Sequence, residues 1–95
     1  MMIKNILDAS DEECTCGSWL RHWKKYSGQN VVYCPVTDCY NKDLVGAHVQ
    51  IISEFDDKHY IFPLCKKHSM WEKDLEVSDS YFLVSAVKSE TCAKL

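Results

Sequence analysis

Two short stretches, Cys34-Pro35-Val36-Thr37-Asp38-Cys39 and Cys65-Lys66-Lys67-His68, decide the fold that this sequence predicts. The first is a C-x4-C turn that contains a proline, and the second is a C-x2-H step. Residues 40–64 separate them, which is enough chain for one short hairpin that brings the two pairs together. Thiolate and imidazole groups are the ligands that zinc prefers, and four of them form a closed, structural site. The sequence therefore predicts one zinc ion held by Cys34, Cys39, Cys65 and His68.

The size of the chain makes such a site useful. A length of 95 residues predicts a single domain, residues 1–95, and 46% hydrophobic with 26% charged residues is ordinary for a globular protein. A core of this size is modest, and a metal that binds only the folded form adds folding free energy. The net charge of −3 argues against a protein that coats nucleic acid nonspecifically. Any contact with nucleic acid would need a local basic patch.

The six cysteines are interpreted through the compartment that the sequence suggests. Residues 1–9 do not resemble a signal peptide, and no apolar run reaches the ~18 residues of a membrane span. We therefore expect a cytoplasmic protein without a membrane partner. In a reducing cytoplasm, cysteines are metal ligands or free thiols more often than disulfides. Three disulfides are the alternative if the protein is exported by another route.

A helix is predicted between Ser18, a good N-cap, and Gly28, a good C-terminal stop. Trp19, Trp23 and Tyr26 fall on one stripe of that helix, so we expect them to pack inward. The basic residues Arg21, Lys24 and Lys25 fall elsewhere on it, and they form either an ordinary solvated face or a phosphate contact. Residues 1–13 are acidic after a short apolar start, and we expect a mobile or loosely packed terminus.

Residues 30–75 form the predicted zinc-binding core. Within it, residues 44–52 read as a strand and residues 59–62 as the returning strand, which Pro63 ends. A helix is predicted from Cys65 to about Leu75, which places Cys65 and His68 on one helical face. Residues 81–87 read as one more strand. The predicted fold class is α+β: a small treble-clef zinc module (zinc knuckle, β-hairpin, α-helix) with an N-terminal helix and a C-terminal strand.

Residues 34–71 resemble the HNH (ββα-metal) endonucleases. The resemblance rests on the Cys34–Cys39 knuckle, on Gly46-Ala47-His48-Val49 in the first strand, and on Pro63-Leu64-Cys65-Lys66-Lys67-His68 at the helix start. It implies that the four predicted ligands hold a structural zinc. It also implies that His48 is the general base that takes a proton from the water attacking the phosphodiester. A separate Mg²⁺ or Mn²⁺ ion would polarise the phosphate.

Two positions depart from the family pattern. Ala47 stands before His48 where an active nuclease often has an acidic metal ligand, and Ser69 follows His68 where the family often has His or Asn. Neither side chain holds a catalytic divalent cation well. The resemblance in fold is therefore stronger than the resemblance in catalytic residues, and we expect weak or no cutting.

A second metal site is one interpretation of the remaining cysteines. Cys14, Cys16, His22 and Cys92 could form it and tie the two ends of the chain together. The C-x-C pair has a tighter bite than the common C-x2-C pair. Packed free thiols and a disulfide are the alternatives.

These observations favour a zinc-binding HNH-like domain directed at nucleic acid. The residues predicted to contact nucleic acid are Arg21, Lys24, Lys25, Lys66 and Lys67. The alternative function is a non-catalytic, zinc-stapled protein-interaction module, such as an inhibitor encoded by a mobile element, and the acidic net charge leans mildly towards it. The choices between DNA and RNA and between oligomeric states stay open.

Overall fold

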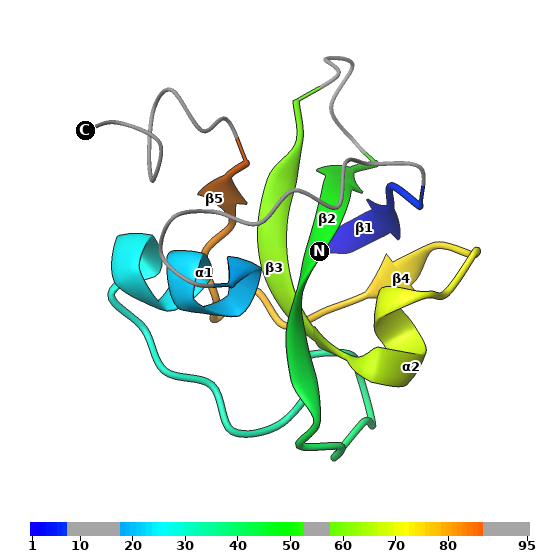
Figure 1. Cartoon of the computed structure of the whole chain (residues 1–95). Helices are drawn as coiled ribbons and strands as arrows, with labels where there is room; N and C mark the ends of the chain where they lie inside the picture. Colours follow the sequence, from blue (N-terminus) through cyan, green and yellow to red (C-terminus); the bar gives the residue numbers. More distant parts are fainter. Residues whose placement is uncertain (8–17, 53–57, 87–95) are drawn as a thin grey trace.

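A single antiparallel sheet organises the chain (Figure 1). The computed structural model describes residues 1–7, 18–52 and 58–86. The strand order is β4-β1-β2-β3-β5. The elements in chain order are β1 (Met2–Asn5), α1 (Trp19–Ser27), β2 (Leu44–Ile51), β3 (Tyr60–Cys65), α2 (Lys66–Ser69), β4 (Leu75–Glu76) and β5 (Val84–Ser85). The α+β part of the predicted fold class is confirmed, whereas the treble-clef assignment stays a prediction.

Both faces of the sheet carry buried side chains. Successive residues of a strand point to opposite faces. Ala47 and its partner Phe62 belong to one core cluster, which also contains Ile3. On the other face, Trp23 of α1 packs against Ile61 and Val84. Since α1 contacts β2, β3 and β5, it covers the second face, as Figure 1 shows.

Helix α1 begins and ends as the sequence predicts. The Ser18 hydroxyl accepts a hydrogen bond from the Arg21 amide (3.2 Å), and Gly28 ends the helix in the left-handed conformation (φ 70°). Trp23 is fully buried, and its indole N–H donates to the Phe82 carbonyl at 2.7 Å. Tyr26, which we expected to face inward, is exposed; His22 is buried in its place. Neither helix that the structure describes is long and apolar enough to cross a membrane.

Helix α1 approaches β2 closely at Gly46. A Cβ atom built on Gly46 would lie 2.4 Å from the backbone carbonyl carbon of Trp19 and 2.6 Å from the amide nitrogen of Leu20. Both are backbone atoms, which cannot swing away as a flexible side chain could. The close packing of α1 on the sheet therefore requires glycine at position 46.

The prediction of a loose terminus is wrong for residues 2–5. They form β1, which lies between β4 and β2, and Ile3 is fully buried opposite Ile51 and Leu75. The Asn5 side-chain amide donates to the carbonyls of His68 (2.7 Å) and Trp71 (2.9 Å). These partners are far away in sequence, so local composition gave no sign of them. Residues 8–13 of that prediction lie outside the described residues.

Helix α2 is shorter than predicted. It ends at Ser69, Met70 is not helical, and Leu75 lies in β4 rather than at the end of the helix. Leu75 pairs with Ile3 and is buried in the same core cluster. This tertiary contact excludes a helix that continues to Leu75.

Strand β3 runs through Pro63, which we expected to end it. Pro63 is buried opposite Gly46, and pairing of β3 with β5 stops at Ile61. The missing N–H of proline is tolerated where a strand has no partner on that side. The C-terminal strand is present as β5, but it covers Val84–Ser85 rather than residues 81–87, of which residue 87 lies outside the described part.

Candidate metal centre

The four predicted zinc ligands meet at one point of the fold. The Sγ atoms of the three cysteines and a ring nitrogen of His68 all lie within 4.8 Å of one another. Two tetrahedral sulfur ligands of zinc, each at about 2.3 Å from the metal, lie about 3.8 Å apart. The Cys39 and Cys65 sulfurs are 3.9 Å apart. His68 Nδ1 lies 3.2 Å from Cys65 Sγ and 3.8 Å from Cys34 Sγ, which brackets the spacing of a mixed sulfur–nitrogen site. The group can therefore hold a metal ion.

The first ligand pair is set by a tight turn. The Cys39 amide donates to the Val36 carbonyl at 3.0 Å, and Asp38 adopts a left-handed conformation (φ 62°) that aspartate tolerates better than most residues. Val36 forms a bridge with Val77, just after β4. Contact with the sheet thus fixes the turn that carries Cys34 and Cys39.

The second ligand pair is set by the junction of β3 and α2. Cys65 is the last residue of β3 and the N-cap of α2, and His68 lies one turn further on. Within the cluster, the Cys65 amide donates to Cys34 Sγ at 3.3 Å, and the His68 amide donates to Cys65 Sγ at 3.5 Å. Hydrogen bonds of this kind stabilise the negative charge of thiolates and orient metal ligands.

The titration behaviour of the ligands fits a site that needs a cation. Burial raises the pKa of the Cys34 thiol to about 12. Burial also opposes ionisation of Cys65, but hydrogen bonds from the Asn41 side chain and the His68 backbone outweigh it, so the pKa of Cys65 is lowered. Burial and then the charge of Lys67 lower the pKa of His68, which favours the neutral imidazole that ligates metals. A bound cation would supply the charge that lets all three cysteines ionise.

Asn41 is a residue that sequence reasoning missed. Its side-chain amide donates to Cys65 Sγ at 3.5 Å, and its backbone carbonyl accepts a hydrogen bond from the Cys34 backbone amide at 2.9 Å. It therefore orients two ligands without being one. Its place two residues after Cys39 was the available signal, but an asparagine in a polar loop is too common for that signal to be specific.

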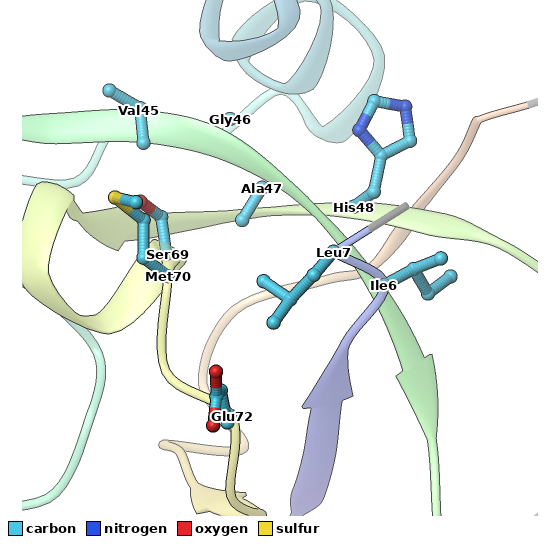
Figure 2. A pocket seen from close by; sticks show the side chains of 9 residues that line it. All are labelled: Ile6, Leu7, Val45, Gly46, Ala47, His48, Ser69, Met70 and Glu72. Atoms are coloured by element: carbon cyan, nitrogen blue, oxygen red, sulfur yellow. The ribbon is translucent and has the colours of Figure 1, made fainter. Parts of the chain in front are cut away.

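His48, the predicted general base, lies on the face of β2 that α1 covers. Its ring packs edge-on against the Trp19 ring, with centroids 4.8 Å apart. His48 also contributes to a cavity of about 450 Å³ between the residues after β1, the first half of β2 and the end of α2 with the residues that follow it. Ala47, Ser69 and Glu72 line the same cavity (Figure 2). The cavity thus brings together Ala47, His48 and Ser69, the three positions at which the sequence was compared with the catalytic residues of the HNH endonucleases.

The cavity does not gather ligands for a second metal. In Figure 2 the imidazole of His48 points toward α1, away from the carboxyl group of Glu72. Across residues 1–7, 18–52 and 58–86, the group of Cys34, Cys39, Cys65 and His68 is the only one with three or more potential ligands close enough to share an ion.

Of the four residues predicted to form a second metal site, the structure describes only His22. His22 is fully buried, and its Nε2 atom lies 2.9 Å from the Ser85 carbonyl oxygen. Burial lowers the pKa of His22, so the neutral ring is favoured and donates to that carbonyl. Cys14, Cys16 and Cys92 lie outside the described residues, and this site stays a prediction.

The basic residues predicted to contact nucleic acid are at the surface of both helices. All five are exposed: Arg21, Lys24 and Lys25 on α1, and Lys66 and Lys67 on α2. The ammonium group of Lys25 lies 5.3 Å from the Tyr26 ring centroid, and that of Lys67 lies 5.8 Å from the Trp71 ring centroid.

Comparisons of this chain with protein-family models, curated proteins and solved structures found no match. The case for function therefore rests on the geometry of the site and its surroundings.

Proposed function

We propose that this chain is a zinc-stabilised, HNH-like module that binds nucleic acid. Zinc is the metal that best suits three thiolates and an imidazole at tetrahedral spacing. With four protein ligands, two of them buried cysteines, the site has no open position for substrate, so its role is structural. The order knuckle, hairpin β2–β3, helix α2 supports the treble-clef assignment.

The nucleic-acid proposal rests on the observation that the five basic side chains of the two helices are exposed and, among the described residues, unpaired. Within the part of the chain that the structure describes, none of them forms an ion pair, and neither helix contains an acidic residue. Unpaired surface cations are free to neutralise phosphates, which is the main source of affinity for nucleic acid. This local excess of positive charge contrasts with the net charge of −3 for the whole chain.

Robust phosphodiester cleavage is not part of the proposal. Ala47 and Ser69 line the cavity beside His48 but offer no strong ligand for a divalent ion. The packing of His48 against Trp19 gives the imidazole a structural role in seating α1 on the sheet. Catalysis needs a base within reach of a water and a cation near the phosphate, and Glu72 is the only carboxylate among the described residues that line the cavity.

A nicking assay tests the catalytic part of this proposal. With Mg²⁺ or Mn²⁺ added, we expect plasmid DNA and structured RNA to stay uncut, and His48→Ala to leave zinc content unchanged. The control is the same assay with chelator, at a level that leaves the structural zinc in place. Metal-dependent nicking that His48→Ala abolishes in a folded, zinc-loaded protein would overturn the non-cutting part of the proposal and establish His48 as a general base.

A binding assay tests the nucleic-acid part. We expect the affinity to fall steeply with salt, and the double charge reversal Lys66→Glu with Lys67→Glu to weaken binding most. The matched control is Lys4→Glu with Lys73→Glu, which changes the net charge equally at two exposed positions outside α1 and α2. Equal losses in both double variants would show that only global charge matters and would contradict a site on the helices.

The second candidate function is a protein-interaction module. The exposed apolar side chains Val32, Met70 and Phe82 favour it, since each leaves more than half of its surface in water. If the chain binds no nucleic acid at low salt, this second candidate replaces the first.

A further inference from the structure

Exposed aromatic side chains border both ligand pairs of the metal centre. Tyr33 directly precedes Cys34, Tyr40 directly follows Cys39, and Trp71 lies three residues after His68. Their exposed fractions are 46%, 74% and 37%. Tryptophan is highly buried on average and tyrosine is intermediate, because each ring carries a large apolar surface together with one polar group. Three such exposed rings beside one metal centre therefore indicate a binding surface.

Two of these rings are accompanied by lysines. The ammonium group of Lys42 lies 5.3 Å from the Tyr33 ring centroid, and that of Lys67 lies 5.8 Å from the Trp71 ring centroid. The Tyr33 and Tyr40 rings are themselves neighbours, with centroids 6.3 Å apart and planes at 80°. Each side of the metal centre thus presents an aromatic ring with a lysine ammonium group over one of its faces.

The backbone holds these rings in place. The Cys34 amide donates to the Asn41 carbonyl at 2.9 Å, which closes the segment that carries Tyr33 and Tyr40. The Lys66 amide donates to the Asp43 carbonyl at 3.1 Å, which joins that segment to the start of α2. Asn5 holds the Trp71 carbonyl at 2.9 Å, and the Trp71 ring packs against the His68 ring with centroids 5.6 Å apart. The backbone that carries the rings is therefore preformed, which lowers the entropy cost of binding.

We infer that this surface, Tyr33, Tyr40, Lys42, Lys67 and Trp71, binds unpaired nucleotides by stacking their bases on the aromatic rings. The inference rests on the proposed function and specifies its substrate as single-stranded nucleic acid. Bases in a duplex are already stacked on their neighbours, whereas the bases of a single strand can splay onto aromatic side chains. A base would stack on the ring face that the lysine leaves open, and Lys42 and Lys67 are near enough to the rings to reach the phosphates of such a nucleotide.

The charges around the surface indicate that stacking contributes more than phosphate contacts. Asp38 and Asp43 are exposed in the same segment as Lys42, and Glu72 follows Trp71. These three carboxylates outnumber the two lysines of the surface, so the surface carries no excess of positive charge. A protein partner of apolar character would have to desolvate Lys42 and Lys67 without a partner charge, which is unfavourable.

The test compares an oligothymidylate with a duplex of mixed sequence at several salt concentrations. We expect the full chain to bind the single strand about ten-fold more tightly than the duplex, and Tyr40→Ala to weaken single-strand binding about ten-fold. Tyr40→Phe should retain wild-type affinity because the ring is kept. Phe82→Ala is the control, since it removes an exposed aromatic ring from another part of the surface. Unchanged zinc content confirms that Tyr40→Ala leaves the metal centre folded.

The outcomes separate this inference from the proposed function. If both nucleic acids bind equally, Tyr40→Ala has no effect and the Lys66 and Lys67 reversals weaken binding, then the stacking inference is wrong and the nucleic-acid proposal stands. If neither nucleic acid binds at low salt, both are wrong. Preference for the single strand that Tyr40→Ala removes and Tyr40→Phe retains supports both.

Discussion

Cys65→Ser is expected to unfold most of the chain at room temperature. A zinc site of this type contributes on the order of 10 kcal/mol in apparent binding free energy, and a domain of this size has a total stability of about 5–15 kcal/mol. Cys65 is fully buried, ends β3 and caps α2 through the hydrogen bond from the His68 amide. Serine is a poor zinc ligand, so the substitution removes the metal and also leaves a buried hydroxyl in its place.

Circular dichroism and denaturant titration measure this loss. The matched control is Cys92→Ser, the same chemical change at a cysteine outside the four-ligand group, for which we expect a loss of about 1 kcal/mol. Equal losses from the two substitutions would contradict our ranking and would favour a second structural site that contains Cys92.

Gly46→Ala is expected to have the second-largest effect, a loss of about 3 kcal/mol in the free energy of unfolding. The added methyl group meets the backbone of Trp19 and Leu20 at 2.4–2.6 Å, so α1 must move off the sheet. That movement also disturbs the contact between Trp19 and His48 and the burial of Trp23. Zinc content should be retained, because Gly46 does not contact the ligands.

Thermal or denaturant unfolding measures this prediction, with Gly28→Asn as the control. Gly28 needs a left-handed conformation, which asparagine accepts, and a Cβ atom there meets nothing within 4 Å. We expect Gly28→Asn to cost less than 1 kcal/mol. A wild-type stability for Gly46→Ala would show that α1 does not pack on β2 as described.

Features with local signals were predictable from the sequence. The α1 caps at Ser18 and Gly28 are local, and so is the strand pattern of residues 44–52, of which residues 44–51 form β2. The ligand spacings made the grouping of Cys34, Cys39, Cys65 and His68 predictable as well. In each case the residues that define the feature lie close together or follow a fixed spacing.

Features that depend on distant partners were not predictable. Strand β1 is defined by pairing with residues near 50 and 75, and its four residues alone carry no strand signal strong enough to outweigh the acidic segment that follows. The end of α2 is set by Asn5 and by burial of Leu75, and Pro63 continues β3 because β5 is short. Tertiary contacts override local propensity in all three cases.

The resemblance to the HNH endonucleases predicted the position of His48 but not the direction of its side chain. The family resemblance indicated His48, which borders the cavity that Ser69 and Glu72 also line, but its imidazole points toward α1 and away from Glu72 (Figure 2). The direction of its ring depends on Trp19, which lies outside the resembling segment. A motif fixes the position of a side chain along a strand, but its neighbours decide the direction in which it points.

The proposed structure of the metal centre is one zinc ion held by the sulfurs of Cys34, Cys39 and Cys65 and by one ring nitrogen of His68. Elemental analysis and X-ray absorption on protein purified without added metal test it most directly. We expect about one zinc per chain, with sulfur ligands near 2.3 Å and one nitrogen near 2.0 Å. Two zinc ions per chain would add the site that contains Cys14, Cys16, His22 and Cys92. Zinc-free protein that folds normally, or a metal coordinated mainly by oxygen, would show that the four residues do not form a structural zinc site.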